Sequence, residues 1–467
     1  MAEKTQPARG MRDFLPADVR RRGYVIGAIR NVYERYGFEP LETPAVENIE
    51  TLMGKYGEEG NQLIFKILKR GEGERSGEAD LALRYDLTVP LARVVAEYGD
   101  KLPKFFKRYQ IQPVWRADRP ARGRFREFYQ CDVDALGSSS MMIEAQLCAA
   151  AGEALNLLGF RDYTIRLNHR QVLAGVLKGA GIASEKQAEA LVALDKLDKI
   201  GAEGVAGELA ARGVSPESGE RLLNFFAQLD DLQQAATLAA DAVGMSERAA
   251  YNAAVLGRLV EFIGDQEAGA RGVDELRQIL RYAEACGIAE RLKVDPNLAR
   301  GLSYYTGAIM EISVADLPGS LGGGGRYDNL VGMFSGKNVP ACGFSLGLER
   351  IIVVMTEREM FPPHLSAASP IDVMVAVWDE GAVEDALLLA RALRKEALRV
   401  EVYAEPDKLG KQFKYASARG VLFVAVAGPD ERARGEVSLK DLRSGEQRSV
   451  TREHAGAAIR ELLASAG

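Results

Sequence analysis

Residues 107–134, KRYQIQPVWRADRPARGRFREFYQCDVD, decide the fold of this chain. Apolar and polar side chains alternate on both sides of a basic loop at residues 116–126, which predicts two antiparallel strands. Side chains on one face of a strand repeat every ~7 Å, so a row of them can span a ligand with an anionic end, a flat middle and a cationic end. A solvent-exposed polar face is the ordinary alternative for this stretch alone. The row in the second arm consists of Arg124, Arg126, Phe128, Gln130, Asp132 and Asp134.

Size and composition restrict the class of protein. A chain of 467 residues predicts two to four domains, and 47% hydrophobic with 27% charged residues is ordinary for a globular protein. The net charge of −6 gives no global attraction to nucleic acid, so any RNA contact must use local basic patches. Four scattered cysteines and three histidines disfavour a zinc site, a disulfide framework and a histidine triad, so we expect no protein-held metal. There is no signal-peptide pattern and no apolar run of ~18 residues, so we expect a cytoplasmic protein without a membrane span.

The segments before the hairpin show clear local patterns. Residues 17–37 have helical periodicity, and residues 38–47 are extended and interrupted by prolines, which suits an edge or interface segment. Residues 63–69 predict a strand, residues 71–80 a polar glycine-rich loop, and residues 81–98 a strand that leads into a helix. Asp86 lies at that turn, where capping the helix is an alternative to a binding role.

After the hairpin, residues 141–158 predict a helix and residues 163–168 a strand. Alanine then rises and strand signals vanish over residues 180–272, which predicts a helical insertion. Ser184 with Gln187 fits a capping box, and Ser215 before a proline fits a helix start. The role of this insertion stays open between packing and RNA contact.

Strand character returns at residues 292–314. Residues 322–325 are four glycines, which permit a tight turn or a close approach of backbone to ligand; the Lys-Ser/Thr of a P-loop is missing. Residues 341–355 predict a strand, a turn and a helix with Arg350 in its first turn, where an arginine opposes the helix dipole and indicates an anionic partner. Beyond a Pro/Ser-rich linker at residues 361–370, alternating strands and helices predict a separate α/β module.

Several spaced motifs together resemble the histidyl-tRNA synthetases, a family of class II aminoacyl-tRNA synthetases. The region around Pro44 resembles the first class II motif, residues 115–134 the second, and residues 343–350 the third. The stretches LRYDLTVP (83–90) and LARGLSYYTG (298–307) are similar to the histidine-specific signatures of the family. The resemblance runs from end to end of the chain.

This resemblance implies an α+β catalytic core, in which helices flank the antiparallel sheet of class II synthetases. Residues 1–179 and 273–360 are expected to form that core, with the helical insertion at residues 180–272 and a C-terminal α/β anticodon-binding domain at residues 371–467. The implied protein is a cytoplasmic homodimer. It would use ATP and Mg²⁺ to convert L-histidine to histidyl-adenylate, and then transfer the histidyl group to the 3′-terminal adenosine of histidine tRNA.

The resemblance also implies roles for individual residues, and their chemistry suits the reaction. Cationic groups stabilise charge at a reacting phosphate, and a planar guanidinium suits bidentate contact better than lysine. The implied catalytic residues are Arg116, Arg300 and Arg350. The implied histidine contacts are Asp86, Leu87, Thr88, Arg116, Gln130, Asp134, Arg300, Tyr304 and Tyr305. The implied ATP contacts are Arg116, Asp118, Arg124, Phe128, which would stack on adenine, and Arg350.

Three positions depart from the family pattern. Ser303 stands where many members have Asp, and Asp118 where motif 2 usually has Glu. Asp134 stands where histidine enzymes vary between Glu and Asp, so that change is harmless. The loop at residues 117–123 is expected to contact the acceptor end of the tRNA. The alternative is a histidine-binding paralogue that does not aminoacylate, the regulatory subunit of ATP phosphoribosyltransferase. We expect that paralogue to lack the C-terminal domain and the motif arginines. This chain has the residues of that predicted domain and also has Arg116, Arg300 and Arg350.

Overall fold

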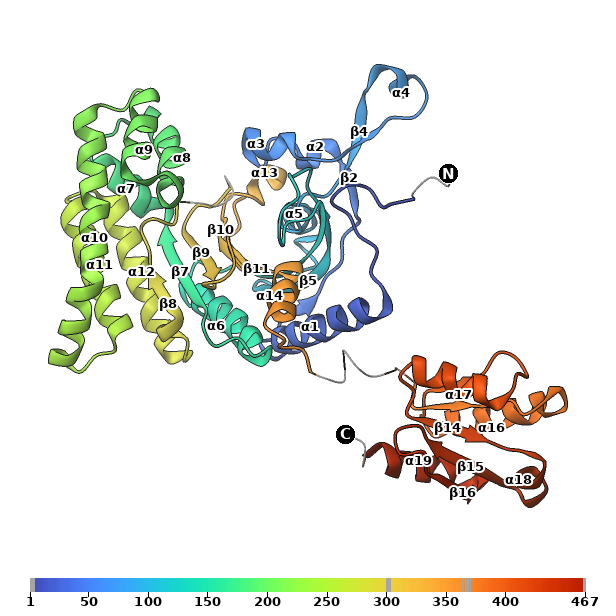
Figure 1. The fold of residues 1–467 in the computed structure, drawn as a ribbon. Coiled ribbons are helices and arrows are strands. Elements are labelled where there is room, and N and C mark those ends of the chain that lie inside the picture. Colours follow the sequence, from blue (N-terminus) through green and yellow to red (C-terminus); the bar gives the residue numbers. More distant parts are fainter. Residues whose placement is uncertain (1–4, 300–303, 363–364, 366–368, 370, 465–467) are drawn as a thin grey trace. The chain divides into compact units, whose positions relative to one another are not determined.

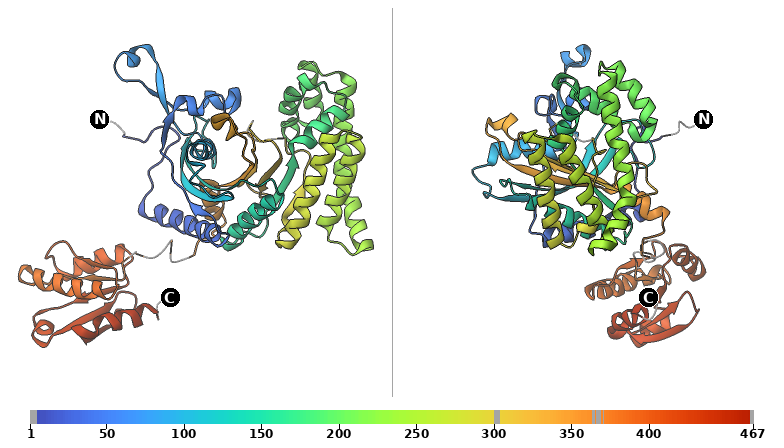
Figure 2. Two further views of the ribbon diagram at one scale, coloured as in Figure 1. Left: turned by 180° about the vertical axis from the view of Figure 1, so that it is seen from behind. Right: turned by 90° about the vertical axis from the view of Figure 1, so that its left-hand side faces the viewer.

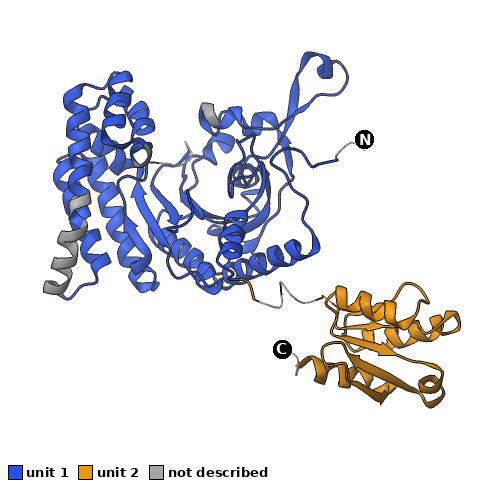
Figure 3. Ribbon diagram, viewed as in Figure 1, with its two compact units in different colours: residues 1–360 blue, residues 361–467 orange. Residues whose placement is uncertain are grey.

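The chain forms two compact units that divide at residue 360 (Figure 3). The computed structural model describes residues 5–299, 304–362, 365, 369 and 371–464. Within those residues no helix is both long enough and apolar enough to cross a membrane.

An eight-stranded sheet forms the centre of the first unit (Figure 1). Its strand order is β1-β5-β6-β11-β10-β9-β7-β8. The inner strands pair antiparallel, as expected for a class II synthetase, whereas β1 on β5 and β8 on β7 are parallel pairs at the two edges. The strands are β1 (Glu39–Pro40), β5 (Phe106–Trp115), β6 (Glu127–Leu136), β7 (Thr164–His169), β8 (Leu292–Val294), β9 (Ala308–Ser313), β10 (Gly322–Arg326) and β11 (Ala341–Gly347).

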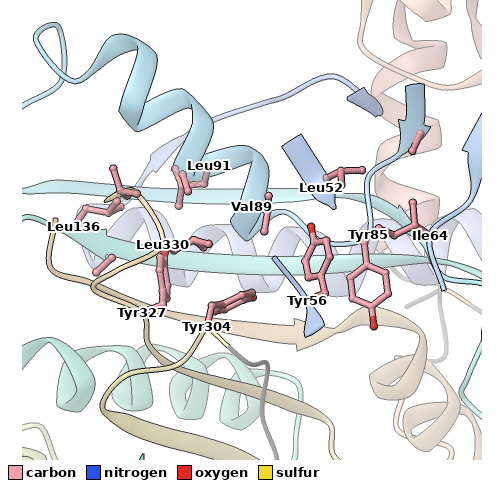
Figure 4. Close-up of a cluster of buried hydrophobic side chains, with 14 of the residues drawn as sticks. Leu52, Tyr56, Ile64, Tyr85, Val89, Leu91, Leu136, Tyr304, Tyr327 and Leu330 are labelled. Carbon is pink, nitrogen blue, oxygen red and sulfur yellow. The ribbon is translucent and has the colours of Figure 1, made fainter. Parts of the chain in front are cut away.

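The predicted hairpin is present as β5 and β6, which pair from Phe106 opposite Leu136 to Trp115 opposite Glu127. The alternative of a solvent-exposed polar face is wrong, because the polar residues near the far end of this face are buried. An apolar cluster packs at this end of the face (Figure 4). It combines residues of α5 (Thr88–Tyr98) with earlier ones such as Leu52 and Tyr56 and later ones such as Tyr304 and Tyr327. The buried polar residues are Arg108, Gln110, Asp132 and Asp134.

Helices cover the opposite, apolar face of the hairpin. The predicted first helix is α1 (Pro16–Arg35), which packs on β5, β6 and α6 (Met142–Leu157). Its Tyr33 hydroxyl donates to the carbonyl of Cys131 in β6 (3.1 Å). The strand and helix predicted over residues 341–355 are β11 and α14 (Leu348–Glu357), and α14 also packs on β6.

A smaller three-stranded sheet, in the order β2-β4-β3, precedes α5. Its strands are β2 (Val46–Asn48), β3 (Lys66–Leu68) and β4 (Ala79–Leu83). The prediction of a loop over residues 71–80 is partly wrong, because this stretch contains the short helix α4 (Glu72–Ser76) and the start of β4. Gly77 ends α4 at φ 77°, a left-handed conformation that favours glycine. The short helices α2 (Ile49–Leu52) and α3 (Gly57–Gln62) were not predicted.

The helical region expected at residues 180–272 stands beside one end of the large sheet, with α7 and α12 at its borders (Figure 2). The predicted cap at Ser215 is confirmed, because its Oγ accepts from the Ser218 amide (3.2 Å). The predicted capping box at Ser184 is wrong: that residue opens a 3₁₀ turn and caps nothing, and the Gln187 side chain donates to Ile182 instead (3.4 Å). The helices are α7 (Arg170–Gly179), α8 (Gln187–Leu194), α9 (Leu197–Ala211), α10 (Pro216–Val243), α11 (Glu247–Ile263) and α12 (Glu267–Ala285).

The second unit is the expected α/β module, a five-stranded sheet in the order β13-β12-β14-β15-β16 with helices packed on it. Among the α-helices described over residues 371–464, α18 (Pro429–Arg434) was not predicted; it is a short helix that ends at Gly435. The remaining elements are β12 (Val373–Val375), α16 (Val383–Lys395), β13 (Val400–Val402), α17 (Leu409–Ala418), β14 (Phe423–Val426), β15 (Glu436–Asp441), β16 (Gln447–Thr451) and α19 (Ala455–Ala464).

A buried ion pair joins α6 to β10. Arg326 Nε and Nη2 lie 2.6 and 2.9 Å from the two carboxylate oxygens of Glu144. Both side chains are almost fully buried. Removing one partner leaves the other charge buried without its counter-ion.

We predict that Glu144→Gln lowers the free energy of unfolding of the first unit by about 3–5 kcal/mol, because the Arg326 guanidinium loses its buried counter-ion and keeps only the partly exposed Asp328. Glu153→Gln is the matched control on the same helix: Glu153 pairs with Arg35 on the surface, and we expect a loss below about 1 kcal/mol. Urea unfolding followed by circular dichroism measures both. Equal losses would show that the buried pair has no special weight.

Candidate active site

A cavity of about 270 Å³ opens over the polar face of β6. Its walls come from β6, β10, β11, the start of α14 and the segment at residues 304–305. Asp86 and Leu87 lie buried beside it, and Arg300 lies outside the described residues. The predicted site residues that line the cavity are Thr88, Arg116, Asp118, Arg124, Phe128, Gln130, Asp134, Tyr304, Tyr305 and Arg350.

Strand register arranges the floor of this cavity in rows that cross β5, β6 and β11. In each row, a polar residue of β6 lies between a long polar residue of β5 and a small residue of β11. The small residues leave the space that the ligand can occupy. The rows are Gln112–Gln130–Gly347, Gln110–Asp132–Ser345 and Arg108–Asp134–Gly343.

Glycines are required here by close approach of neighbouring atoms. A Cβ at Gly343 would lie 1.9 Å from Asp134 Oδ1, and a Cβ at Gly324 would lie 2.1 Å from the Gly343 carbonyl oxygen. The four glycines at residues 322–325 were predicted to permit either a tight turn or a close approach of backbone to ligand. They do not form a tight turn, because they belong to β10. Residues 322–324 line the cavity, which fits a close approach of backbone to ligand.

Asp86 caps the start of α5 and lies buried beside the cavity. Its Oδ1 accepts from the Val89 amide at the start of α5 (3.0 Å) and from the Tyr56 hydroxyl (3.0 Å), and its Oδ2 accepts from the Tyr304 hydroxyl (3.1 Å). Burial raises the pKa of this carboxyl, while its hydrogen bonds and Arg116 lower it. The carboxylate is therefore fixed at the cavity wall and oriented by three donors.

Three residues at this end were missed from the sequence. The fully buried Arg108 places Nη2 2.9 Å from Asp134 Oδ2, 3.9 Å from Asp132 Oδ2 and 3.2 Å from the Leu87 carbonyl oxygen. The Tyr327 hydroxyl donates to Asp134 Oδ1. Asp132 was placed in the polar row without a role. The even-numbered spacing of Arg108 with Asp132 and Asp134 across the hairpin is the signal that could have identified the group.

The other end of the cavity is cationic. Arg116 Nε donates to the Tyr85 carbonyl (3.0 Å), and its guanidinium lies 5.1 Å from the centre of the Phe128 ring. Arg124 pairs with Asp118 at 3.0 Å while remaining about half exposed. Arg350 Nη1 donates to the Ser320 carbonyl (2.6 Å). Three guanidiniums and one aromatic ring therefore converge on one wall, which suits an aromatic ligand with phosphates.

Glu349, also missed from the sequence, connects this wall to α1. Its Oε1 accepts from Arg22 Nη1 (2.8 Å) and its Oε2 accepts from the Tyr129 amide in β6 (2.9 Å). The predicted place of Phe125 on the apolar face of the hairpin is wrong, because it lines the cavity and the Arg12 guanidinium lies 3.4 Å from its ring centre. Phe125 precedes the start of β6, so the strand alternation does not reach it.

Comparison with known proteins agrees with this geometry. The family model of the histidyl-tRNA synthetases matches residues 10–351, and a model of the anticodon binding domain matches residues 372–462. The chain belongs to the histidyl-tRNA synthetase family. The class II fold expected from the motifs is thereby confirmed.

Individual family members match over nearly their whole length. A histidine–tRNA ligase of Gloeobacter violaceus is 43% identical over 485 residues, which cover 98% of each chain. One of Porphyromonas gingivalis is 41% identical over 465 residues, 96% of this chain and 97% of the relative. A crystal structure of histidyl-tRNA synthetase from Nostoc superposes with a TM-score of 0.77 at 32% identity, covering 99% of this chain and all of that one. The chain is thus a histidine–tRNA ligase, and the non-aminoacylating paralogue is the less supported alternative.

We predict that Gly343→Ala raises the KM for histidine by about tenfold to a hundredfold and changes the KM for ATP little, because a Cβ there displaces the Asp134 carboxylate. Gly27→Ala in α1 is the control, since a Cβ at Gly27 meets nothing within 4 Å. Steady-state kinetics with each substrate varied in turn measures the effect. A parallel rise in both KM values would contradict a local role for Gly343.

Proposed function

We propose that this cavity binds histidine at its carboxylate end and ATP at its cationic end, and joins them as histidyl-adenylate. The observation that carries the proposal is the separation of charge in one cavity: buried carboxylates at one end, guanidiniums at the other, and Phe128 between them. A ligand that has a cationic amino-acid end, a flat base and phosphates is complementary to this distribution of charge and aromatic surface. Histidine and ATP together supply these groups.

At the anionic end, Asp86, Thr88 and Gln130 receive the α-ammonium group, and Leu87 contributes through its backbone, whose carbonyl is held by Arg108. Asp134 and Tyr305 face the imidazole ring, with Tyr304 beside them. Asp86 suits its role because three donors hold it in place before the substrate arrives. Preorganised acceptors of this kind bind the substrate without a further cost of ordering the protein.

At the cationic end, Arg116 holds the substrate carboxylate beside the α-phosphate, and Arg300 supplies a second guanidinium there. Arg124 and Arg350 hold the outer phosphates, Asp118 orients Arg124 by their ion pair, and Phe128 stacks on adenine. When the histidine carboxylate oxygen attacks the α-phosphorus, pyrophosphate leaves with increased negative charge. Fixed cations near that charge lower the barrier more than they stabilise the bound substrates.

Mg²⁺ is proposed to arrive with ATP. Among the described residues, no three His, Cys, Asp or Glu side chains gather as a metal site. Mg²⁺ in nucleotide sites is commonly held by one or two carboxylates together with substrate phosphates. Asp118 and Glu349 are the carboxylates that line the cationic end, so they fit such an ion, which would neutralise charge on the leaving pyrophosphate.

The remaining assignments concern other parts of the chain. We propose that residues 1–179 and 273–360 are the catalytic core, residues 180–272 an insertion domain, residues 361–370 a linker and residues 371–467 the anticodon-binding domain. Exposed basic residues on and next to α17 support an RNA contact in the last of these. We further propose that the loop at residues 117–123 contacts the acceptor end of histidine tRNA, and that the protein acts as a homodimer in the cytoplasm.

The purified protein is predicted to catalyse pyrophosphate–ATP exchange that depends on histidine and on no other amino acid. Arg116→Ala should lower the rate constant of exchange by about 10²–10³-fold, with a much smaller loss of histidine affinity, because this contact strengthens in the transition state. Arg119→Ala, an exposed residue of the same loop, is the control and should retain exchange. Histidine binding without exchange in the unmodified protein would favour the regulatory paralogue.

Ending the chain after residue 368 is predicted to separate the two steps. The first unit is compact by itself, so exchange should persist at a reduced level. Charging of histidine tRNA should fall far more, because the proposed anticodon contacts are removed. Undiminished charging in an aminoacylation assay would refute the assignment of residues 371–467.

A further inference from the structure

Asp132 is a buried carboxylate that the proposed reaction leaves without a role. It lines the cavity between Gln130 and Asp134 on β6, and only 2% of its surface is exposed. Its Oδ1 accepts no hydrogen bond from any described residue, although a hydrogen bond from the Ser345 side chain to the carboxyl group lowers its pKa. Buried polar atoms normally have a partner, and an ionised carboxylate that lacks one is strongly disfavoured. A donor from a bound ligand would satisfy this oxygen.

The balance of charge around Asp132 indicates what kind of ligand donor would bind there. Among the described residues, Arg108 is the cation that pairs with Asp132, but it lies closer to Asp134 (2.9 Å) than to Asp132 (3.9 Å). Two buried carboxylates therefore share one guanidinium, and within the described part of the chain one negative charge is uncompensated. Burial, opposed by Arg108 and reinforced by Asp134, raises the pKa of Asp132 to about 7.

Other described groups do not remove this excess. Arg84 is engaged by backbone carbonyls at Thr43 and Pro113. The nearby tyrosines are neutral, because burial raises the pKa of each phenol, and burial likewise raises the pKa of the Cys131 thiol. Asp86 adds a further negative charge, which Arg116 partly offsets. The charged and titratable groups around Asp132 in the described residues include Arg84, Arg108, Arg116, Asp86, Asp134, Tyr33, Tyr305, Tyr327 and Cys131.

We propose that Asp132 is a further substrate-binding residue, and that Asp132 and Asp134 together bind the ring of histidine as an imidazolium. Neutral imidazole offers one N–H donor, whereas imidazolium offers two on opposite sides of the ring. The ~7 Å repeat of side chains along β6 is close to the span of two acceptors that flank such a ring at hydrogen-bond distance. The inference rests on histidine being the substrate, and it specifies the protonation state in which the ring is bound.

Calorimetry of histidine binding to the full-length protein at pH 8, repeated in buffers of different ionisation enthalpy, counts the protons taken up. At pH 8 the free ring is neutral, and Asp132, with a pKa of about 7, is largely ionised before binding. We expect an uptake close to one proton per site. Asp132→Asn leaves one carboxylate for one guanidinium, so uptake should fall close to zero. Asp372→Asn, which alters an Arg-paired carboxylate in the second unit, is the control and should match the unmodified protein.

A second ligand keeps the inference testable if Asp132→Asn does not fold. The ring of 1,2,4-triazole-3-alanine stays neutral near neutral pH, so it should bind the unmodified protein more weakly than histidine and without proton uptake. Histidine binding without proton uptake at pH 8, or equal uptake by the unmodified protein and Asp132→Asn, would overturn the inference. Persistent histidine-dependent exchange alongside such a result would leave the proposed function standing, whereas absence of exchange would remove both.

Discussion

The buried guanidinium of Arg108 is the interaction on which the site depends. It comes from β5 and reaches Asp134 on β6, the Leu87 carbonyl just before α5 and the Gln110 side chain on its own strand. Carboxylates buried without a cation would take up protons, and as neutral groups they would bind cationic donors less well. Arg108 supplies that cation from inside the sheet, where it does not occupy the cavity. The hairpin can therefore bury a polar row that would otherwise have to face water.

The site also requires that the neighbouring strands pack closely. Glycines in β10 and β11 make this possible, because they have no side chains. β10 and β11 lie against the carboxylate row, and any Cβ at Gly343 would fall on Asp134. The same glycines keep a hollow above the sheet while its backbone hydrogen bonds remain intact. The cavity is thus built into the centre of a continuous sheet, where strands hold each polar group more rigidly than loops could.

Local patterns explain which parts of this arrangement were predictable. The hairpin, α1, α14 and the alternating elements of the second unit follow from period-2 and helical spacing, which depend on neighbours in sequence. Burial of the polar row was not predictable in this way, because it depends on α5 and on Tyr304 and Tyr327 folding over it. Glu349 was missed for the same reason: its partner Arg22 is 327 residues away. The residue roles came from motif resemblance, since no single residue carries enough signal alone.

On the proposed function, the same physical features account for selection among amino acids. A side chain without ring N–H groups would enter a space where the carboxylate of Asp134 is already desolvated, and it would offer that carboxylate no donor. Buried groups left unpaired cost more than a missing methylene, so a site that hydrogen-bonds its substrate rejects isosteres more strongly than an apolar pocket can. The rejection depends on Asp134 staying ionised, which requires Arg108. On this proposal, selectivity for the amino acid depends on Arg108, a cation that pairs with Asp134 from outside the cavity lining.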